Sequence, residues 1–133
     1  MGAACTNKPA PINYGQDECK FCMMKIMDAR FGAEIVTDKG KTFKYDSAEC
    51  MLQDISREEH NVNSAQVLVT FIDVPNQLQN AFTSYYVVSK NIPSPMGGNL
   101  SSYATQQLAS AIAEENQGAV YTWQEIISKD AVK

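Results

Sequence analysis

Sulfur side chains are concentrated in one short stretch of the chain, residues 17–27. Cys19 and Cys22 form a Cys-x-x-Cys pair, and Met23, Met24 and Met27 follow it closely. Thiolate and thioether sulfur are soft donors, which select Cu(I) or thiol-bound zinc over magnesium or calcium, and a thioether binds without losing a proton. Methionine often fills cores, but beside a Cys-x-x-Cys pair the composition favours at least one methionine as a metal ligand.

A Cys-x-x-Cys pair alone fits a redox pair, half of a zinc site or a soft-metal clamp. A thioredoxin-type pair lies in a βαβ context, whereas this pair precedes a predicted hairpin, which argues against redox catalysis. A structural zinc site needs four ligands. Cys19, Cys22 and Cys50 supply three, and we expect His60, in a charged segment, to be a surface histidine.

Three other residues are candidates for the same site. Cys50 falls in the first turn of a predicted helix, where partial positive charge favours thiolate; the competing interpretation is a small buried hydrophobe. Asp46 is expected mainly to cap that helix, with metal contact as the alternative. Met96 lies in a loop rich in Pro and Gly, at residues 93–99, and loops of this kind carry function more often than packing. If the two halves of the chain face each other, Met96 can reach the cysteine pair.

The N-terminus resembles the end of a bacterial lipoprotein signal without its apolar part. Small residues precede Cys5, and a polar, proline-containing tether follows it up to residue 16. We expect Cys5 to be the lipid-modified first residue of the mature protein, and residues 1–4 to belong to a trimmed leader. The alternative is an ordinary tail with an incidental cysteine. Apart from Cys5, three cysteines remain, and this odd number excludes a complete disulfide framework within the chain.

Length and charge narrow the class of protein. With 133 residues and 44% hydrophobic content, the chain can form one compact domain or two small ones that depend on each other. A net charge of −4 argues against a nucleic-acid partner, which requires a basic surface. Apolar runs fall well short of the roughly 20 residues of a membrane-spanning helix, so we expect membrane attachment through the N-terminal lipid only.

The order strand, strand, helix, strand occurs twice along the chain, which predicts an α+β fold of two tandem ββαβ-like small domains packed together. We expect a tether at 1–16, a first domain at 17–76 and a second at 77–133, with a break near 73–80. In the first helix, Asp46 or Ser47 is the predicted cap and Glu49 is placed for a capping box. The predicted strands are 33–37, 42–45, 66–72, 84–88, 100–103 and 119–123; the predicted helices follow Asp46 and Thr105, with a final helical turn at 124–129.

Several blocks of sequence between residues 17 and 127 resemble the NosL family, and they occur in the same order as in that family. Many members of that family have Cys-Gly-Met where this chain has Cys22-Met23-Met24, which adds a thioether here. The matching blocks are Cys19-x-x-Cys22-x-Met24-x-Ile26, Asp28-x-Arg30-Phe31-Gly32-Ala33-Glu34-Ile35, Lys39-Gly40-Lys41, Phe43-x-Tyr45-Asp46, Pro95-Met96-Gly97-Gly98 with Leu100 and Tyr103, and Tyr121-x-Trp123-x-Glu125-Ile126.

This resemblance implies a bacterial lipoprotein anchored on the periplasmic side, at the outer membrane, that binds one Cu(I) per chain and is not an enzyme. It implies a metallochaperone that supplies copper to nitrous oxide reductase maturation or a related copper system. Its partner would be a copper-receiving protein or the assembly machinery of that protein. The implied fold is two ββαβ domains distantly similar to part of organomercurial lyase. Matched position by position to the family, the residues implied first as copper donors are Cys22, Met24 and Met96. Cys19 is implied as a fourth or alternative ligand, and Asp46 is the weaker candidate.

The first half also resembles YHS/TRASH-type metal modules, in which a Cys-x-x-Cys-x-Met hairpin precedes a Tyr-Phe-Cys-Ser-x-x-Cys helix start. The stretch from Tyr45 to Cys50 has the same spacing, with Asp46 in place of the first cysteine of that motif. Cys50 then matches the second cysteine of the motif, so a role as a metal ligand is one option for it. The alternative function is therefore a structural zinc or YHS-like scaffold module. A third is an organomercurial-lyase-like enzyme that uses Cys22, Cys50 and Asp46.

Overall fold

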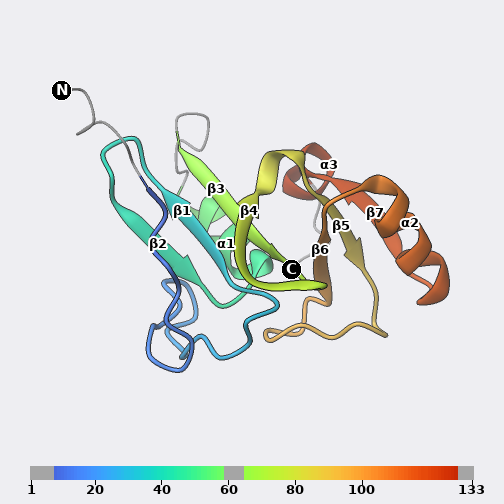
Figure 1. Cartoon of the computed structure of the whole chain (residues 1–133), viewed down its shortest axis with the longest axis horizontal. Helices are drawn as coiled ribbons and strands as arrows, with labels where there is room; N and C mark the ends of the chain where they lie inside the picture. Colours follow the sequence, from blue (N-terminus) through green and yellow to red (C-terminus); the bar gives the residue numbers. More distant parts are fainter. Residues whose placement is uncertain (1–7, 59–64, 129–133) are drawn as a thin grey trace.

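The computed structural model describes residues 8–58 and 65–128, which form two antiparallel sheets accompanied by helices (Figure 1). This arrangement confirms the predicted α+β class; the likeness to organomercurial lyase stays a prediction. In chain order the elements are β1 (Ala33–Val36), β2 (Thr42–Tyr45), α1 (Ala48–Glu58), β3 (Gln66–Phe71), β4 (Val74–Asn80), the 3-10 turn η3 (Ala81–Thr83), β5 (Tyr85–Val88), β6 (Leu100–Tyr103), α2 (Gln106–Glu115), β7 (Ala119–Thr122) and α3 (Trp123–Ser128).

The first sheet has the strand order β2-β1-β3-β4, and every neighbouring pair is antiparallel. The hairpin turn between β1 and β2 contains Gly40 at a φ of 85°, a conformation that glycine adopts without steric cost. β3 is buried along nearly its whole length, which agrees with its run of consecutive apolar residues. The break expected near residues 73–80 is wrong, because that segment is β4. Its polar residues concealed it: β4 is an edge strand that is largely exposed and is held by its pairing with β3.

The second sheet has the order β6-β5-β7 and carries α2, which packs against all three strands. Thr105 caps α2 as predicted, since its side chain accepts a hydrogen bond from the Leu108 N–H at 3.1 Å. The final helical turn is also confirmed, as α3. Within the described part of the chain, no helix has both the length and the apolar character needed to cross a membrane.

The two halves of the chain share one hydrophobic core. Its largest cluster joins Tyr45 and Met51 from the first half to Tyr86, Leu100 and Trp123 from the second. A backbone hydrogen bond from Ile72 to Ser102, at 3.2 Å, links the two sheets directly. Figure 1 shows the second sheet beside the end of β3 and β4. Loops from both halves therefore lie near one another, which is the condition for a site built from both.

Candidate metal centre

The loop that carries the Cys-x-x-Cys pair is held in shape by its own backbone. The Cys19 N–H donates to the Met24 carbonyl at 2.8 Å, and the Met23 N–H donates to the Cys19 carbonyl at 2.9 Å. A β-bridge between Glu18 and Lys25 closes the base of the loop. Met23 has a φ of 67°, the left-handed conformation that lets the chain turn back on itself. The loop is thus a compact hairpin, referred to below as the sulfur hairpin (residues 18–25).

Contacts to β2 and α1 fix the position of the sulfur hairpin. The Lys20 N–H donates to the Lys44 carbonyl at 2.9 Å. The Lys20 ammonium also pairs with Asp54 of α1 at 3.0 Å, and Asp54 accepts a further hydrogen bond from the Tyr45 hydroxyl at 2.5 Å. Asp54 is four residues after Cys50, on the same side of the helix. The buried carboxylate therefore brings the hairpin to the helix face that carries Cys50.

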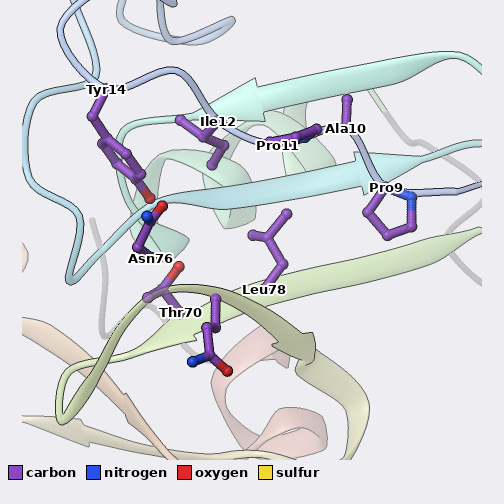
Figure 2. Close-up of a pocket in the computed structure, with 9 residues that line it drawn as sticks. Pro9, Ala10, Pro11, Ile12, Tyr14, Thr70, Asn76 and Leu78 are labelled. Atoms are coloured by element: carbon purple, nitrogen blue, oxygen red, sulfur yellow. The ribbon is translucent and has the colours of Figure 1, made fainter.

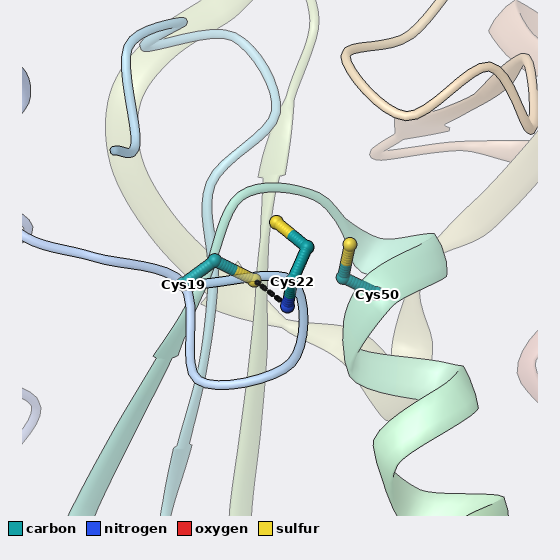
Figure 3. Close-up of side chains that lie close together, drawn as sticks. All are labelled: Cys19, Cys22 and Cys50. Carbon is teal, nitrogen blue, oxygen red and sulfur yellow. Dashed lines mark hydrogen bonds between the residues drawn. The ribbon is translucent and has the colours of Figure 1, made fainter. Parts of the chain in front are cut away.

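Three thiols meet where the sulfur hairpin approaches the first turn of α1. The Sγ atoms of Cys19, Cys22 and Cys50 all lie within 4.8 Å of one another (Figure 3). Cys19 and Cys50 are buried, whereas Cys22 is partly exposed. The Cys22 N–H points back to Cys19 Sγ at 3.5 Å. All three are free cysteines, so this cluster offers three soft donors, one of them accessible from outside.

Hydrogen bonding distributes protons unequally among these thiols. A hydrogen bond from Cys50 lowers the pKa of Cys19 to about 5, and backbone N–H groups lower it further. The same contact raises the pKa of Cys50, and burial raises the pKa of Cys22. At neutral pH the cluster therefore holds one thiolate, at Cys19, and two protonated thiols. A soft cation can bind the first sulfur without displacing a proton.

Asp46 lies against the cluster and is itself buried. Its Oδ2 accepts a hydrogen bond from the Cys22 thiol at 3.8 Å. Burial raises its pKa to about 6, and the nearby Cys19 sulfur adds to that shift. The cap of α1 comes from the alternative candidate, since the Ser47 hydroxyl accepts from the Cys50 N–H at 3.3 Å. Asp46 is therefore positioned to accept a proton from the Cys22 thiol.

The two methionines that the resemblance pointed to lie outside the buried cluster. The Met24 side chain, at the end of the sulfur hairpin, is 61% exposed, and that of Met96 is 40% exposed. Met23 and Met27 are exposed as well, so none of the four fills a core. The core-packing interpretation of these residues is excluded, and their thioethers are available to solvent or to a metal.

The loop that carries Met96, residues 93–99, is fastened to α1 by one buried carboxylate. Glu49 Oε2 accepts a hydrogen bond from the Gly98 N–H at 2.5 Å, and Oε1 accepts one from the Ser94 hydroxyl. The Ser94 hydroxyl oxygen also accepts from the Asn99 N–H at 2.8 Å. Glu49 therefore reaches across to the second half instead of closing the capping box expected of it. Because Glu49 and Cys50 both lie in the first turn of α1, this contact brings the Met96 loop (residues 93–99) to the end of the helix that carries Cys50.

The structure thus joins Cys19, Cys22 and Asp46 in one cluster and leaves Met24 and Met96 at its surface. The structure also places Cys50, whose role the sequence left open, in the thiol cluster. It shows that Glu49, which the sequence indicated only as a helix-capping residue, binds the loop that carries Met96. Cys5 and His60 lie outside the described residues. Among the described residues, this group of mutually close Cys, His, Asp or Glu ligand atoms has three members. A closed structural zinc site needs four ligands.

A separate pocket of about 230 Å³ lies under the N-terminal tether (Figure 2). Tether residues 9–12 and Tyr14 form one wall, and β3 and β4 form the other, through Thr70 and Leu78. None of its lining residues carries sulfur or imidazole. The pocket therefore lacks soft donors, and the thiol cluster is the better candidate for metal chemistry.

Three comparisons with known proteins agree with one another. The family model described as NosL matches residues 9–132. A curated relative, the "Copper-binding lipoprotein NosL" of Stutzerimonas stutzeri, is 29% identical over 120 residues, an alignment that covers 85% of this chain and 63% of that relative. The chain thus spans less than two thirds of the relative's length. The crystal structure of the copper chaperone NosL from Shewanella denitrificans has a similar fold, with a TM-score of 0.77 at 22% identity, over 90% of this chain and 96% of that one.

Proposed function

This chain belongs to the NosL family, and from that premise we propose that it is a metallochaperone that carries one Cu(I) per chain. The proposed donors are Cys22, Met24 and Met96, with Cys19 as a fourth or alternative ligand and Asp46 after them. The observation that carries the proposal is the cluster of three free thiols, together with the exposed thioether of Met24 in the same hairpin and that of Met96 in a loop bound to the first turn of α1. Such an all-sulfur surface suits a soft monovalent ion. The two NosL proteins described above are themselves named for copper.

Delivery of copper needs a site that is tight but open. Cys22 is partly exposed and Met24 and Met96 are exposed, so a partner's sulfur atoms can approach from outside and replace them one at a time. A closed tetrahedral cage would not release its metal by that route. The proposed role is transfer by ligand exchange, without a chemical reaction on the cargo. The proposed recipient is the maturation system of nitrous oxide reductase or a related copper system.

We further propose that the chain is a lipoprotein held on the periplasmic side of a membrane through Cys5. The support is the run of small residues before Cys5, and the relative from Stutzerimonas stutzeri is named a lipoprotein. Expression with the natural leader should yield a protein whose mass includes a lipid and which sediments with membranes. A Cys5→Ala variant of the same protein should lose both properties while keeping its copper affinity.

Anaerobic titration of the reduced protein with Cu(I), against a competing chelator, tests the central proposal. We expect one tight equivalent in the wild-type chain and none in Cys22→Ser. X-ray absorption at the copper edge should show mainly sulfur neighbours, and an oxygen neighbour would indicate that Asp46 also binds the ion. A wild-type chain that fails to compete with the chelator would refute the copper role.

The alternative, a structural zinc module, gives the opposite result in a second measurement. Structural zinc contributes directly to folding free energy. Purified protein would then contain stoichiometric zinc and would unfold when a chelator removes it. If the copper proposal is right, the metal-free chain should stay folded. Its hydrophobic core is built from residues of both halves and does not depend on the ion.

A further inference from the structure

Cys50 is the thiol of the cluster that the proposed donor set does not use. It is the third residue of α1 and is buried. Its sulfur lies within 4.8 Å of the other two (Figure 3) and shares a hydrogen bond with Cys19. A cysteine that only filled space would need no sulfur partner, whereas this thiol lies close to two others. The position of Cys50 is thus suited to a ligand.

The geometry of the three sulfurs fits a single ion. Thiolates bind metals such as zinc at about 2.3 Å, so three of them around one ion in a plane lie about 4 Å apart. The three Sγ atoms here are already within 4.8 Å of one another. Closure on an ion therefore requires shifts of less than an ångström, which side-chain rotation can supply. Three sulfurs without a fourth donor also match the low coordination that Cu(I) accepts better than zinc does.

We propose that Cys19, Cys22 and Cys50 form an inner, all-thiolate binding site for the Cu(I) cargo (the inner seat), distinct from the exposed thioethers of Met24 and Met96. Cys22 belongs to both sets of donors, because it is the partly exposed member of the buried cluster. The ion rests on the inner seat and moves to the outer donors for exchange with a partner. This inference rests on the proposed copper function and adds to it a storage position that keeps the ion away from solvent.

Substitution of Cys50 tests the inner seat in the reduced full-length chain. Cys50→Ser should weaken Cu(I) binding by at least about tenfold, since even loss of a residue that only supports a ligand costs that much. Ala48→Ser is the matched control, because it adds the same hydroxyl to a buried position in the same helical turn and removes no sulfur. It should bind Cu(I) like the wild type. Equal affinity of Cys50→Ser and the wild type would overturn the inner seat.

Cd(II) binding gives an independent measure of how many thiolates bind one ion, because each Cd–thiolate bond contributes to the near-ultraviolet absorbance. The near-ultraviolet charge-transfer absorbance of the Cd(II)-loaded chain should fall to about two thirds in Cys50→Ser, because one of three soft ligands is gone. If that variant fails to fold, the wild type and the Met24→Leu/Met96→Leu double variant decide the question by X-ray absorption. Copper in the double variant should keep three sulfur neighbours, and a count of two would refute the seat.

These measurements separate the two proposals. A wild-type chain that binds Cd(II) through three thiolates but does not bind Cu(I) tightly would retain the thiol seat and refute the copper function. A chain that binds Cu(I) tightly but equally well without the Cys50 thiol would retain the copper function and refute the seat.

Discussion

The backbone N–H of Gly98 donates a hydrogen bond to Glu49 Oε2 at 2.5 Å, across the boundary between the two halves of the chain. The approach is so close that a Cβ at position 98 would lie 2.5 Å from that same oxygen. Glu49 is 1% exposed, and both of its carboxyl oxygens accept hydrogen bonds from the Met96 loop. This contact makes the geometry of the candidate site depend on both halves.

The first prediction follows from this contact. Gly98→Ala should lower the free energy of unfolding by about 1–3 kcal/mol, the usual cost of overpacking. Glu49→Ala should also destabilise, by about 1–3 kcal/mol for each donor left without an acceptor. The double variant should lose less than the sum of the two, because removal of the Glu49 carboxylate makes room for the new methyl group. Urea unfolding of the metal-free chain measures all three, and additive losses would contradict the contact.

The second prediction concerns the ion pair between the partly exposed Lys20 and the buried Asp54. Asp54→Asn should destabilise the chain by about 1–3 kcal/mol, because it removes the carboxylate that pairs with the Lys20 ammonium and accepts from the Tyr45 hydroxyl. The matched control is Asp28→Asn, which breaks the more exposed pair of Asp28 and Arg30 and should cost about 0–1 kcal/mol. Thermal unfolding compares the two variants, and similar losses would show that Asp54 does not anchor the sulfur hairpin.

The third prediction is a pH dependence of stability due to Glu34, a fully buried residue of β1. Its Oε2 accepts from the Ala10 N–H at 2.9 Å, while Oε1 has no hydrogen-bond partner among the described residues. Burial raises its pKa from 4.5 to about 7; Lys44 opposes the shift and Asp17 adds to it. The folded chain thus holds this proton more tightly than the unfolded chain does. The contribution of Glu34 to stability is therefore greatest at acidic pH and falls as the pH rises from 4.5 to 7.

Comparison of Glu34→Gln with the wild type measures this effect. The wild type should lose stability relative to the variant across that pH range, at about 1.4 kcal/mol for each unit of pKa difference. Glu114→Gln, at an exposed position of α2, is the control and should follow the wild type. A Glu34→Gln variant with the same pH profile as the wild type would show that Glu34 does not hold an extra proton in the folded state.

The fourth prediction separates Met24 from its neighbour Met27. Both side chains are exposed to a similar extent, 61% and 67%, but only Met24 is a proposed copper donor. Met24→Leu should weaken Cu(I) binding by about tenfold or more, and Met27→Leu should leave it unchanged. Competition titrations with the two variants decide the matter. Equal affinities would remove Met24 from the donor set.

Much of the fold could be predicted from the sequence, because each half repeats local signals with a clear physical cause. Turn residues near Gly40 marked the first hairpin, and Thr105 marked the start of α2. β4 was missed because an exposed edge strand has no hydrophobic alternation to reveal it. Its existence depends on pairing with β3, a contact between segments that local pattern does not encode.

The candidate site was less predictable for a similar reason. The Cys-x-x-Cys spacing and the adjacent methionines were visible as a local cluster, so Cys19, Cys22 and Met24 stood out at once. The contact of Cys50 with the pair, and that of Glu49 with the Met96 loop, join residues far apart in the chain. Glu49 had an ordinary local explanation as a helix-capping residue, which concealed its role between the halves. Contacts of this kind become visible only in three dimensions.

The division of the sulfur donors among three segments sets an order of events during biogenesis. A chain still emerging from the ribosome presents the sulfur hairpin first, before α1 and the 93–99 loop exist to complete the site. On the proposed copper function, the full set of sulfur donors is therefore available to an ion only after the chain has been made through residue 99.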